Sequence, residues 1–352
     1  MKALKIVETK NIQVIEDLPI PNLRPGYLLV RVVCAALNPC DAKNVFCENS
    51  AGVHFGTDYS GIVEKTGHGY SKEWRKGDRI FGVIMGANPL QPTDGAFAEY
   101  AVVKADVQYR MPDYMTFEVA ASLGVGLGTS ALGICYKLNL KIEPDSEDDT
   151  KMGEGRHVLI YGGSTATGTI STQLVRLAGY IPLTTCSPKN FDLVQSYGAE
   201  AAFDYHDSRC AQKVSSFAGV SINRAFDTIS DSQSARICAD ILSNNPASAY
   251  CSTLPLSEPF RKKLVVPKKL LLWSGFGEPV CFMGYTLPVV KEDFVFMKEW
   301  TELAESLLEE KELTHHPIRM MEGGLDGIWK GLQMIHNNQV SGEKLVYTLS
   351  SP

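Results

Sequence analysis

The chain has 352 residues, 44% hydrophobic and 21% charged, which is an ordinary globular composition and long enough for two domains. A formal charge of −6 gives no reason to expect nucleic acid or an anionic membrane surface as a partner, and no apolar run reaches membrane-spanning length. Nine cysteines without a C-x-x-C pair, and an N-terminus without a signal-peptide core, predict reduced thiols and a cytoplasmic protein.

The first part of the chain, to about residue 110, contains short strand-like runs next to turn residues. These runs cover residues 28–37, 61–64, 79–84 and 96–103, and their spacing predicts a compact β-barrel-like domain. Residues 117–140 are helix-rich with many small side chains. The acidic run 143–149 is interpreted as a surface insertion without chemistry.

The stretch 156–190 is the most informative. An apolar strand-like run, 158–161, breaks at Gly162-Gly163, an amphipathic helical pattern follows, and a second strand-like run covers 181–186. This βαβ pattern has a loop of small residues at its first turn, where a helix N-terminus can bind phosphate. Gly162, Gly163 and Gly168 match the dinucleotide-binding pattern only in part, so the glycines alone are equally compatible with a plain tight βα turn.

Residues after the second strand-like run favour NADP(H) over NAD(H). An NAD site has a carboxylate after this strand, which binds the ribose 2′-hydroxyl. At that place this chain has Ser187, Pro188, Lys189 and Asn190, and their hydroxyl, ammonium and amide donors suit a 2′-phosphate. Asp204 is interpreted as a structural strand-end residue. The loop residues expected around the pyrophosphate are Ser164, Thr165, Ala166 and Thr167, although any single hydroxyl there could instead be a helix cap.

Further strand-like runs at 201–205, 224–228 and 249–253 predict an open parallel sheet with its ligand beyond the carboxyl ends of the strands. A helical pattern begins at Glu292, and a closing strand at 344–348 returns to the first domain. The chain also contains a basic cluster, whose members are Arg261, Lys262, Lys263, Lys268 and Lys269. This cluster is either a solvent-exposed face or an electrostatic binding site for an acidic partner.

Several motifs connect the chain to a known superfamily: Asn38-Pro39-Cys40-Asp41, Gly56-Thr57-Asp58-Tyr59-Ser60-Gly61, Lys76-Gly77-Asp78-Arg79-Ile80-Phe81-Gly82, Gly95-Ala96-Phe97-Ala98-Glu99-Tyr100 and Ser341-Gly342-Glu343-Lys344. With them the chain resembles the medium-chain dehydrogenase/reductase superfamily over essentially its full length. The resemblance implies an α/β fold in which a Rossmann doubly wound parallel sheet, residues 121–289, is inserted in a GroES-like β-rich domain formed by residues 1–120 and 290–352.

No metal is expected. The zinc alcohol dehydrogenases of this superfamily have a Cys where this chain has Asn38, and Gly-His-Glu where it has Gly56-Thr57-Asp58. Cys40 lies beside Asn38 but occupies the family's Ser/Thr position. His315 and His316 are adjacent in a strand-like segment, so their side chains should point to opposite faces, and a structural role is expected.

Within the zinc-free branch, further motifs are similar to those of the trans-acting enoyl reductases of fungal polyketide synthases. They are Tyr161-Gly162-Gly163-Ser164-Thr165-Ala166-Thr167, Thr185-Cys186-Ser187-Pro188-Lys189-Asn190-Phe191-Asp192-Leu193, Phe203-Asp204-Tyr205, Phe276-Gly277-Glu278 and His315-His316-Pro317. The similarity implies NADPH-dependent reduction of an α,β-unsaturated thioester held on the acyl carrier protein of a polyketide synthase.

The resemblance also implies the site residues. Lys43 is the candidate to stabilise developing negative charge or to relay a proton, with an exposed surface lysine as the competing interpretation. The implied cofactor residues are Cys40, Asp41, Lys43, Ser164, Thr165, Ala166, Thr167, Ser187, Pro188, Lys189, Asn190, Tyr205, Thr253, Leu254, Val346 and Tyr347. The implied substrate residues are Leu123, Gly124, Val125, Gly126, Leu127, Gly128, Thr129, Ser130, Phe276, Gly277, Glu278, Pro279 and Val280. Residues 46–50 lack the tyrosine that mitochondrial enoyl reductases use, so no proton donor is evident.

Two other functions stay open at this point. One is a free-standing NADPH:quinone or enone reductase, and the other is an NADPH-binding partner subunit or isomerase that transfers no hydride. A monomer is expected, because dimeric relatives pair a strand near residues 275–285, and here that strand contains Pro279 and three glycines.

Overall fold

The computed structural model describes residues 1–46, 51–142, 156–282 and 285–352. The chain forms two compact units, one of residues 1–125 with 273–352 and the other of residues 126–272. The acidic run 143–149 and residues 47–50 of the stretch without a tyrosine lie outside the described residues. Within the described ranges, no helix is both long and apolar enough to cross a membrane.

The second unit, residues 126–272, is built on a six-stranded sheet in which all neighbouring strands run parallel. The strand order is β10-β9-β8-β11-β12-β13, so the chain begins in the middle, builds one half outward and then builds the other. That reversal creates a crevice at the carboxyl ends of the central strands. The strands are β8 (His157–Tyr161), β9 (Ile181–Cys186), β10 (Ala201–Asp204), β11 (Arg224–Asp227), β12 (Ala249–Ser252) and β13 (Lys268–Lys269).

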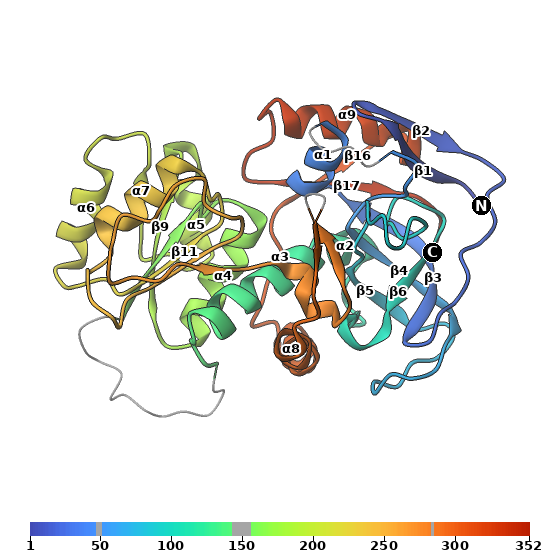
Figure 1. Ribbon diagram of the computed structural model, residues 1–352, viewed down its shortest axis with the longest axis horizontal. Coiled ribbons are helices and arrows are strands. Elements are labelled where there is room, and N and C mark those ends of the chain that lie inside the picture. The colour runs from blue at the N-terminus through green and yellow to red at the C-terminus, as the bar shows by residue number, and fades with distance from the viewer. Residues whose placement is uncertain (47–50, 143–155, 283–284) are drawn as a thin grey trace. The chain divides into compact units, whose positions relative to one another are not determined.

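Helices of this unit lie around the sheet (Figure 1). They are α4 (Ala166–Leu177), α5 (Phe191–Ser196), α6 (Cys210–Ala218) and α7 (Ser232–Ile241). The crossover connections of βαβ units are right-handed. The helices α4 and α5 lead from β8 toward β10 and therefore cover one face of the sheet. The helices α6 and α7 lead in the opposite direction, from β10 toward β12, and therefore cover the other face. The predicted open parallel sheet with alternating helices is therefore confirmed.

The first unit, residues 1–125 with 273–352, contains a seven-stranded sheet organised around β3 (Tyr27–Ala36). One edge of β3 pairs with β4, and the other pairs with β6 along its first half and with β17 at its end. The other strands of this sheet are β4 (Asp58–Thr66), β5 (Arg79–Val83), β6 (Tyr100–Lys104), β7 (Tyr109–Arg110), β16 (Ile318–Met321) and β17 (Lys344–Thr348). A separate hairpin joins β1 (Ala3–Glu8) to β2 (Asn11–Ile15).

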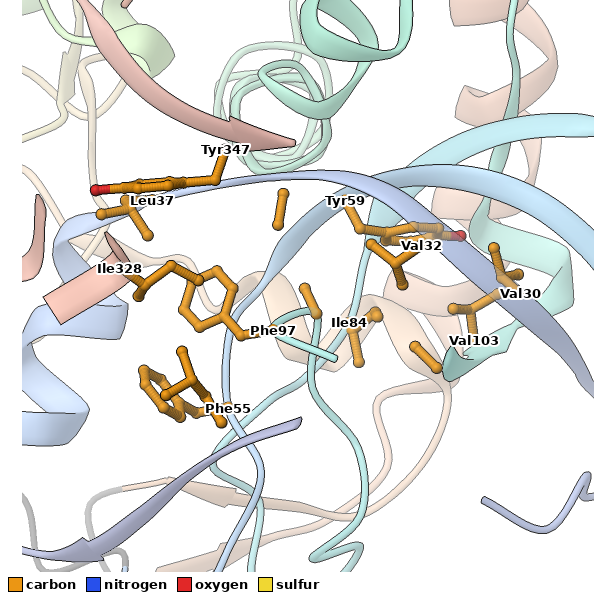
Figure 2. Packing of buried hydrophobic residues seen from close by; sticks show 14 of the residues in the cluster. Val30, Val32, Leu37, Phe55, Tyr59, Ile84, Phe97, Val103, Ile328 and Tyr347 are labelled. Carbon is orange, nitrogen blue, oxygen red and sulfur yellow. The ribbon is translucent and has the colours of Figure 1, made fainter. Parts of the chain in front are cut away.

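The helices of the first unit are α1 (Pro39–Phe46), α2 (Phe117–Ala121), α8 (Lys291–Glu309) and α9 (Gly324–His336). Between the units the chain runs through α3 (Gly124–Ser130), which continues into a π-helical segment, Ala131–Lys137. The core of the first unit is shown in Figure 2, where Phe55 and Phe97 lie close together and Tyr347 lies beside Leu37. The rings of Phe55 and Phe97 meet edge to face with centroids 5.0 Å apart, a favourable aromatic geometry.

Two predicted strands differ in the structure. The run 96–103 forms a regular strand only from Tyr100. The Phe97 carbonyl accepts the Leu4 N–H, and the Phe97 N–H donates to the Phe55 carbonyl, so Phe97 does not continue the ladder of β6. Residues Leu272–Phe276 form a 3₁₀ helix, so the strand predicted near residues 275–285 begins only at β14 (Val280–Phe282). It pairs with β15 (Tyr285–Leu287) in a two-stranded sheet of its own.

Candidate active site

The turn between β8 and α4 is shaped by its three glycines. Gly162 has a φ of 81°, which side-chain-bearing residues rarely adopt. A Cβ on Gly163 would lie 2.6 Å from the Thr184 side chain, and one on Gly168 would lie 2.3 Å from the Gly162 carbonyl oxygen. The geometry of this turn therefore requires glycine at all three positions, which explains why the sequence matches the dinucleotide-binding pattern there.

Thr165 is the N-cap of α4. Its hydroxyl accepts the Gly168 N–H at 2.9 Å and donates to the Gly162 carbonyl at 2.9 Å, so this side chain has the capping role that the sequence left open. Ser164, Ala166 and Thr167 are half-buried at the same turn. The N–H groups of a first helical turn lack intrahelical acceptors, and they can therefore receive an anion.

The residues chosen for the 2′-phosphate lie along neighbouring strand ends. Asp204 of β10 is in register with Cys186 of β9, which places Tyr205 and Ser187 one residue beyond the same level of the sheet. Ser187 and Tyr205 are half-buried, Pro188 and Lys189 are exposed, and Asn190 is buried. The Asp204 carboxylate accepts the backbone N–H of His206 at 2.9 Å, in agreement with the structural role expected for it.

A buried carboxylate, Asp227, orders the loop next to this turn. Its Oδ1 accepts the N–H of Ser230 at 2.8 Å, and its Oδ2 accepts the hydroxyls of Ser234 at 2.6 Å and Tyr250 at 2.8 Å. Burial raises the pKa of Asp227, and these donors oppose the rise. Ser230 Oγ in turn accepts the N–H groups of Thr253 and Leu254 at 3.0 and 3.2 Å. Through Ser230, Asp227 thus positions Thr253 and Leu254, which are two of the implied cofactor residues. The sequence predicts for Asp227 only a position at the end of a strand.

In the first unit, the Asp58 carboxylate joins three segments that carry implied site residues. It is fully buried, forms an ion pair with the ammonium of Lys344 at the start of β17, and accepts the Asn38 side-chain amide at 2.9 Å just before α1. Its other oxygen accepts the Val125 N–H at 2.7 Å in α3. Lys344 Nζ also donates to Asn38 Oδ1 at 3.0 Å. Asp58 therefore ties together α1, β17 and the beginning of α3.

The Asp41 carboxyl is part of the same cluster. Its Oδ2 accepts the Asn38 N–H at 2.8 Å and the Thr57 hydroxyl at 3.3 Å, while its buried Oδ1 has no hydrogen-bond partner within the described part of the chain. Burial and the neighbouring Asp58 charge raise the pKa of Asp41 to about 7, although the Asn38 N–H opposes the rise. Burial also raises the pKa of the Cys40 thiol.

The remaining implied residues of the first unit differ in exposure. Lys43 is exposed on α1, whereas Val346 and Tyr347 are buried. The Tyr347 hydroxyl donates to the Gly327 carbonyl at 3.0 Å within the core, so only the backbone of this residue is left for a ligand. Leu123 is buried, and a Cβ on Gly124 would lie 2.3 Å from the Gly82 carbonyl oxygen.

Residues 126–130, which are implied substrate residues in the second unit, are buried. Ser130 Oγ donates to the Thr167 carbonyl at 3.0 Å, which connects this segment to α4.

Glu278 is tied to β3 and β6. Its carboxylate accepts the Tyr27 hydroxyl at 2.7 Å and the Lys104 ammonium at 2.6 Å. The Arg24 guanidinium stacks over the Tyr27 ring at 3.8 Å and is bidentate to Asp94 at 2.9 and 2.6 Å. These pairs hold one wall of a pocket in the first unit, lined by Ile84, Met85, Asn88, Phe276, Glu278 and Pro279 among others. Gly277 precedes Glu278 with a φ of 67°, and Val280 begins β14.

Comparison with known proteins decides the family. The chain is 38% identical over 343 residues to a trans-enoyl reductase from Aspergillus sclerotiorum, covering 95% of this chain and 96% of that protein. It is 37% identical over 348 residues to a trans-enoyl reductase from Aspergillus niger, covering 96% and 94%. The chain belongs to the trans-enoyl reductase family.

The chain also matches the alcohol dehydrogenase GroES-like domain over residues 24–113. Among solved structures it is similar to a putative zinc-dependent alcohol dehydrogenase from Rhizobium etli, with a TM-score of 0.81, 22% identity and coverage of 100% and 99%. It is also similar to the CurK enoyl reductase, with a TM-score of 0.76, 14% identity and coverage of 99% and 98%. The fold is that of the medium-chain dehydrogenase/reductase superfamily, as the motifs predict.

Metal-binding side chains do not gather in the described part of the chain. No group of three or more His, Cys, Asp or Glu residues there could hold an ion. Asn38 and Thr57, which stand where the zinc enzymes have ligands, hydrogen-bond to each other at 2.9 Å. His316 is buried, and burial lowers the pKa of its imidazole to about 3.

Sequence reasoning missed the supporting contacts of Asp58, Asp227 and Glu278. Asp58 and Lys344 lie 286 residues apart, and Glu278 and Tyr27 lie 251 apart, so no local pattern connects them. The available signal was the presence of polar residues inside otherwise apolar motifs, because a buried charge requires a partner.

Proposed function

We propose that this protein is a trans-acting enoyl reductase that uses NADPH to reduce the α,β-double bond of an enoyl thioester carried on the acyl carrier protein of a polyketide synthase. The observation that carries the proposal is the near-full-length similarity to fungal trans-enoyl reductases. In this proposal residues 121–289 form the NADP-binding domain, and residues 1–120 with 290–352 form the GroES-like domain.

The residues of the β8–α4 turn fit a dinucleotide. The three glycines leave room for close approach to the backbone, and α4 presents its first N–H groups at the turn. In the sheet, Ser187 and Lys189 would hold the 2′-phosphate, with Tyr205 on the same edge. Asp204 is engaged with His206, which supports a site without a ribose carboxylate. NADPH, when bound, supplies a hydride.

The chain's own residues would then orient the reactants and stabilise charge. Lys43 is exposed on α1, and its ammonium would stabilise the negative charge that develops on the thioester oxygen. The Asp58 cluster would hold α1, β17 and α3 in fixed positions, and Glu278 would hold the substrate wall at Phe276. Together these contacts would preorganise both the implied cofactor residues and the implied substrate residues.

The direct test supplies purified protein with a crotonyl thioester on a phosphopantetheinylated carrier protein. NADPH oxidation is followed by absorbance and the thioester by mass spectrometry. The proposal expects a butyryl product, two mass units heavier, and slower reaction with NADH. Rapid reduction of simple quinones but not of the thioester would establish the stand-alone reductase instead. NADPH binding without oxidation, with an unchanged product mass, would establish the non-reducing subunit or the isomerase.

The NADPH assignment has a separate test, Lys189→Asp. Loss of a charge-assisted hydrogen bond to phosphate, worth about 1.5–3 kcal/mol, should weaken NADPH binding by about 10- to 100-fold. NADH, which lacks the 2′-phosphate, should be affected much less. Lys141→Asp, at another exposed lysine of the same unit, is the control with the same change of charge. Equal weakening of NADPH and NADH by Lys189→Asp would refute the 2′-phosphate assignment.

A further inference from the structure

The pocket of the first unit that contains Glu278 presents no unbalanced charge. The two carboxylates in its described lining are Asp94 and Glu278. Asp94 is paired with the Arg24 guanidinium, and Glu278 accepts both the Lys104 ammonium and the Tyr27 hydroxyl. Two cations therefore balance two carboxylates. Because each charged group already has a partner of opposite charge, the pocket suits a neutral ligand better than an ion.

Most of the remaining lining is apolar. Phe276 and Pro279 are among the implied substrate residues, and Ile84 and Met85 follow the end of β5. A hydrocarbon chain gains free energy when such side chains remove it from water. The lining therefore fits the acyl portion of a thioester. The full apolar set is Ile84, Met85, Val102, Val103, Phe276 and Pro279.

One wall of this pocket adjoins the Asp58 cluster. The Ile84 N–H donates to the Thr57 carbonyl at 2.8 Å. The Thr57 hydroxyl in turn accepts the Asn38 amide at 2.9 Å and lies 3.9 Å from the thiol of Cys40, an implied cofactor residue. One wall is thus connected to implied cofactor residues, and another consists of implied substrate residues. A chain that enters this pocket therefore lies next to the implied reaction site.

The pocket also contains a polar group without a partner. Asn88 is only 5% exposed, and its Oδ1 accepts the Leu90 N–H at 3.1 Å. A backbone N–H can only donate, so this contact identifies the other atom of the amide as the NH₂ group. That NH₂ group donates to no residue that the structure describes, and it is not fully enclosed. Because buried polar groups are nearly always hydrogen-bonded, this open donor indicates an acceptor on the ligand.

The loop that carries Asn88 is fixed by its backbone. The Ala87 N–H donates to the His54 carbonyl at 2.8 Å, and two successive turns follow, in which the Gln91 N–H donates to the Asn88 carbonyl and the Asp94 N–H to the Gln91 carbonyl. Ala87 has a φ of 55°, which side-chain-bearing residues rarely adopt. Such strain persists only where surrounding contacts maintain it, and it is concentrated at ligand sites. Asn88 therefore has a fixed position before a ligand arrives, which lowers the entropic cost of binding.

We propose that this pocket binds the acyl chain of the substrate, and that the Asn88 amide donates a hydrogen bond to a carbonyl or hydroxyl oxygen on that chain; this inference rests on the proposed function. The substrate class is an enoyl thioester whose chain bears an oxygen substituent away from the thioester. A plain hydrocarbon chain fills the apolar part of the pocket but leaves the NH₂ group unsatisfied. Sites built to hydrogen-bond a substrate group reject analogues that lack it, so Asn88 determines specificity.

The test measures binding without turnover. Its ligands are saturated acyl pantetheines, which offer no double bond to reduce: octanoyl pantetheine and its mono-oxo counterparts, with the carbonyl at each position beyond the γ-carbon. The variant is Asn88→Leu, which removes the amide at similar size. The control is Asn337→Leu, the same change at an exposed asparagine of the same unit. Dissociation constants are measured by calorimetry.

The inference expects the wild type and the control to bind at least one mono-oxo chain about 5- to 150-fold more tightly than octanoyl pantetheine. Asn88→Leu should lose most of this preference, because it binds the mono-oxo chain more weakly and octanoyl pantetheine equally or more tightly. Retained octanoyl binding also shows that the variant is folded. Asn88→Asp, which keeps an acceptor for the Leu90 N–H and replaces the NH₂ group by an oxygen, should show the same loss and decides the matter if Asn88→Leu does not fold.

Three results would overturn the assignment. The first is that the wild type binds none of these chains or prefers no mono-oxo chain. The second is that both Asn88 variants weaken all chains equally, and the third is that they weaken binding of free pantetheine, which would place the contact on the pantetheine arm. If the preference is found but NADPH does not reduce the enoyl counterpart of the preferred chain, the proposed function is refuted while the pocket assignment stands.

Discussion

Replacing Asp58 with Asn isolates the role of the buried carboxylate. Asn has nearly the same shape and keeps one oxygen to accept the Val125 N–H, but it leaves the ammonium of Lys344 without its counter-charge. Both side chains are almost fully buried, with 0% of Asp58 and 4% of Lys344 exposed. Removing one partner of such a pair costs about 3–5 kcal/mol, a large fraction of the roughly 5–15 kcal/mol that stabilises a typical domain.

Urea unfolding followed by tryptophan fluorescence measures this loss in the relevant unit. All four tryptophans, Trp74, Trp273, Trp300 and Trp329, belong to the unit that contains Asp58. We expect the unfolding free energy of Asp58→Asn to fall by about 3–5 kcal/mol. Lys344→Met, which leaves the carboxylate unpaired, should cause a loss of similar size.

The double variant decides whether the two side chains act as a pair. With both charges removed, Asp58→Asn with Lys344→Met should be more stable than the sum of the two single losses predicts, by at least about 1 kcal/mol. Single losses below about 1 kcal/mol, or strictly additive losses, would refute the role assigned to the pair. The implied cofactor residues on α1 and β17 would then need another source of support.

Two further predictions concern the same unit and the β8–α4 turn. Gly168→Ala should abolish dinucleotide binding, because its Cβ would lie 2.3 Å from the Gly162 carbonyl oxygen, whereas Gly126→Ala, whose nearest neighbour is 3.5 Å away, should be tolerated; calorimetric NADPH binding equal for the two variants would contradict this. Asp41, whose pKa burial raises to about 7 from an ordinary 3.8, should stabilise the fold below pH 3.8 and lose that contribution as pH rises through 7. The stability of the wild type relative to Asp41→Asn should therefore fall between about pH 4 and 7 in urea titrations, and a constant difference would show that Asp41 does not titrate there.

Local patterns predicted the regular elements well. The apolar run 181–186 became β9 (Ile181–Cys186), and the closing run 344–348 became β17 (Lys344–Thr348), because each is a continuous strand-forming segment between turns. The helical period from Glu292 became α8 (Lys291–Glu309). The turn glycines could also be predicted, since the backbone of a tight turn requires them whatever the rest of the chain does.

Elements that depend on distant partners were not predictable in this way. Residues 96–99 have the composition of a strand, but Phe97 pairs with Leu4 and Phe55, which local periodicity cannot reveal. The same reason applies to the site, where Asp58 meets Lys344 and Glu278 meets Tyr27 across more than 250 residues. A single sequence shows that a charge stands in an apolar motif, but not which residue balances it.

Hydride transfer is the central claim, and a single turnover with NADPH deuterated at C4 of the nicotinamide tests it most directly. The enzyme is mixed with the labelled cofactor and a carrier-bound crotonyl thioester, and the product is analysed by mass spectrometry and NMR. We predict a saturated butyryl thioester with deuterium on the β-carbon and, in D₂O with unlabelled NADPH, deuterium on the α-carbon. A recovered thioester that carries no deuterium from the cofactor, although NADPH binds, would contradict the account.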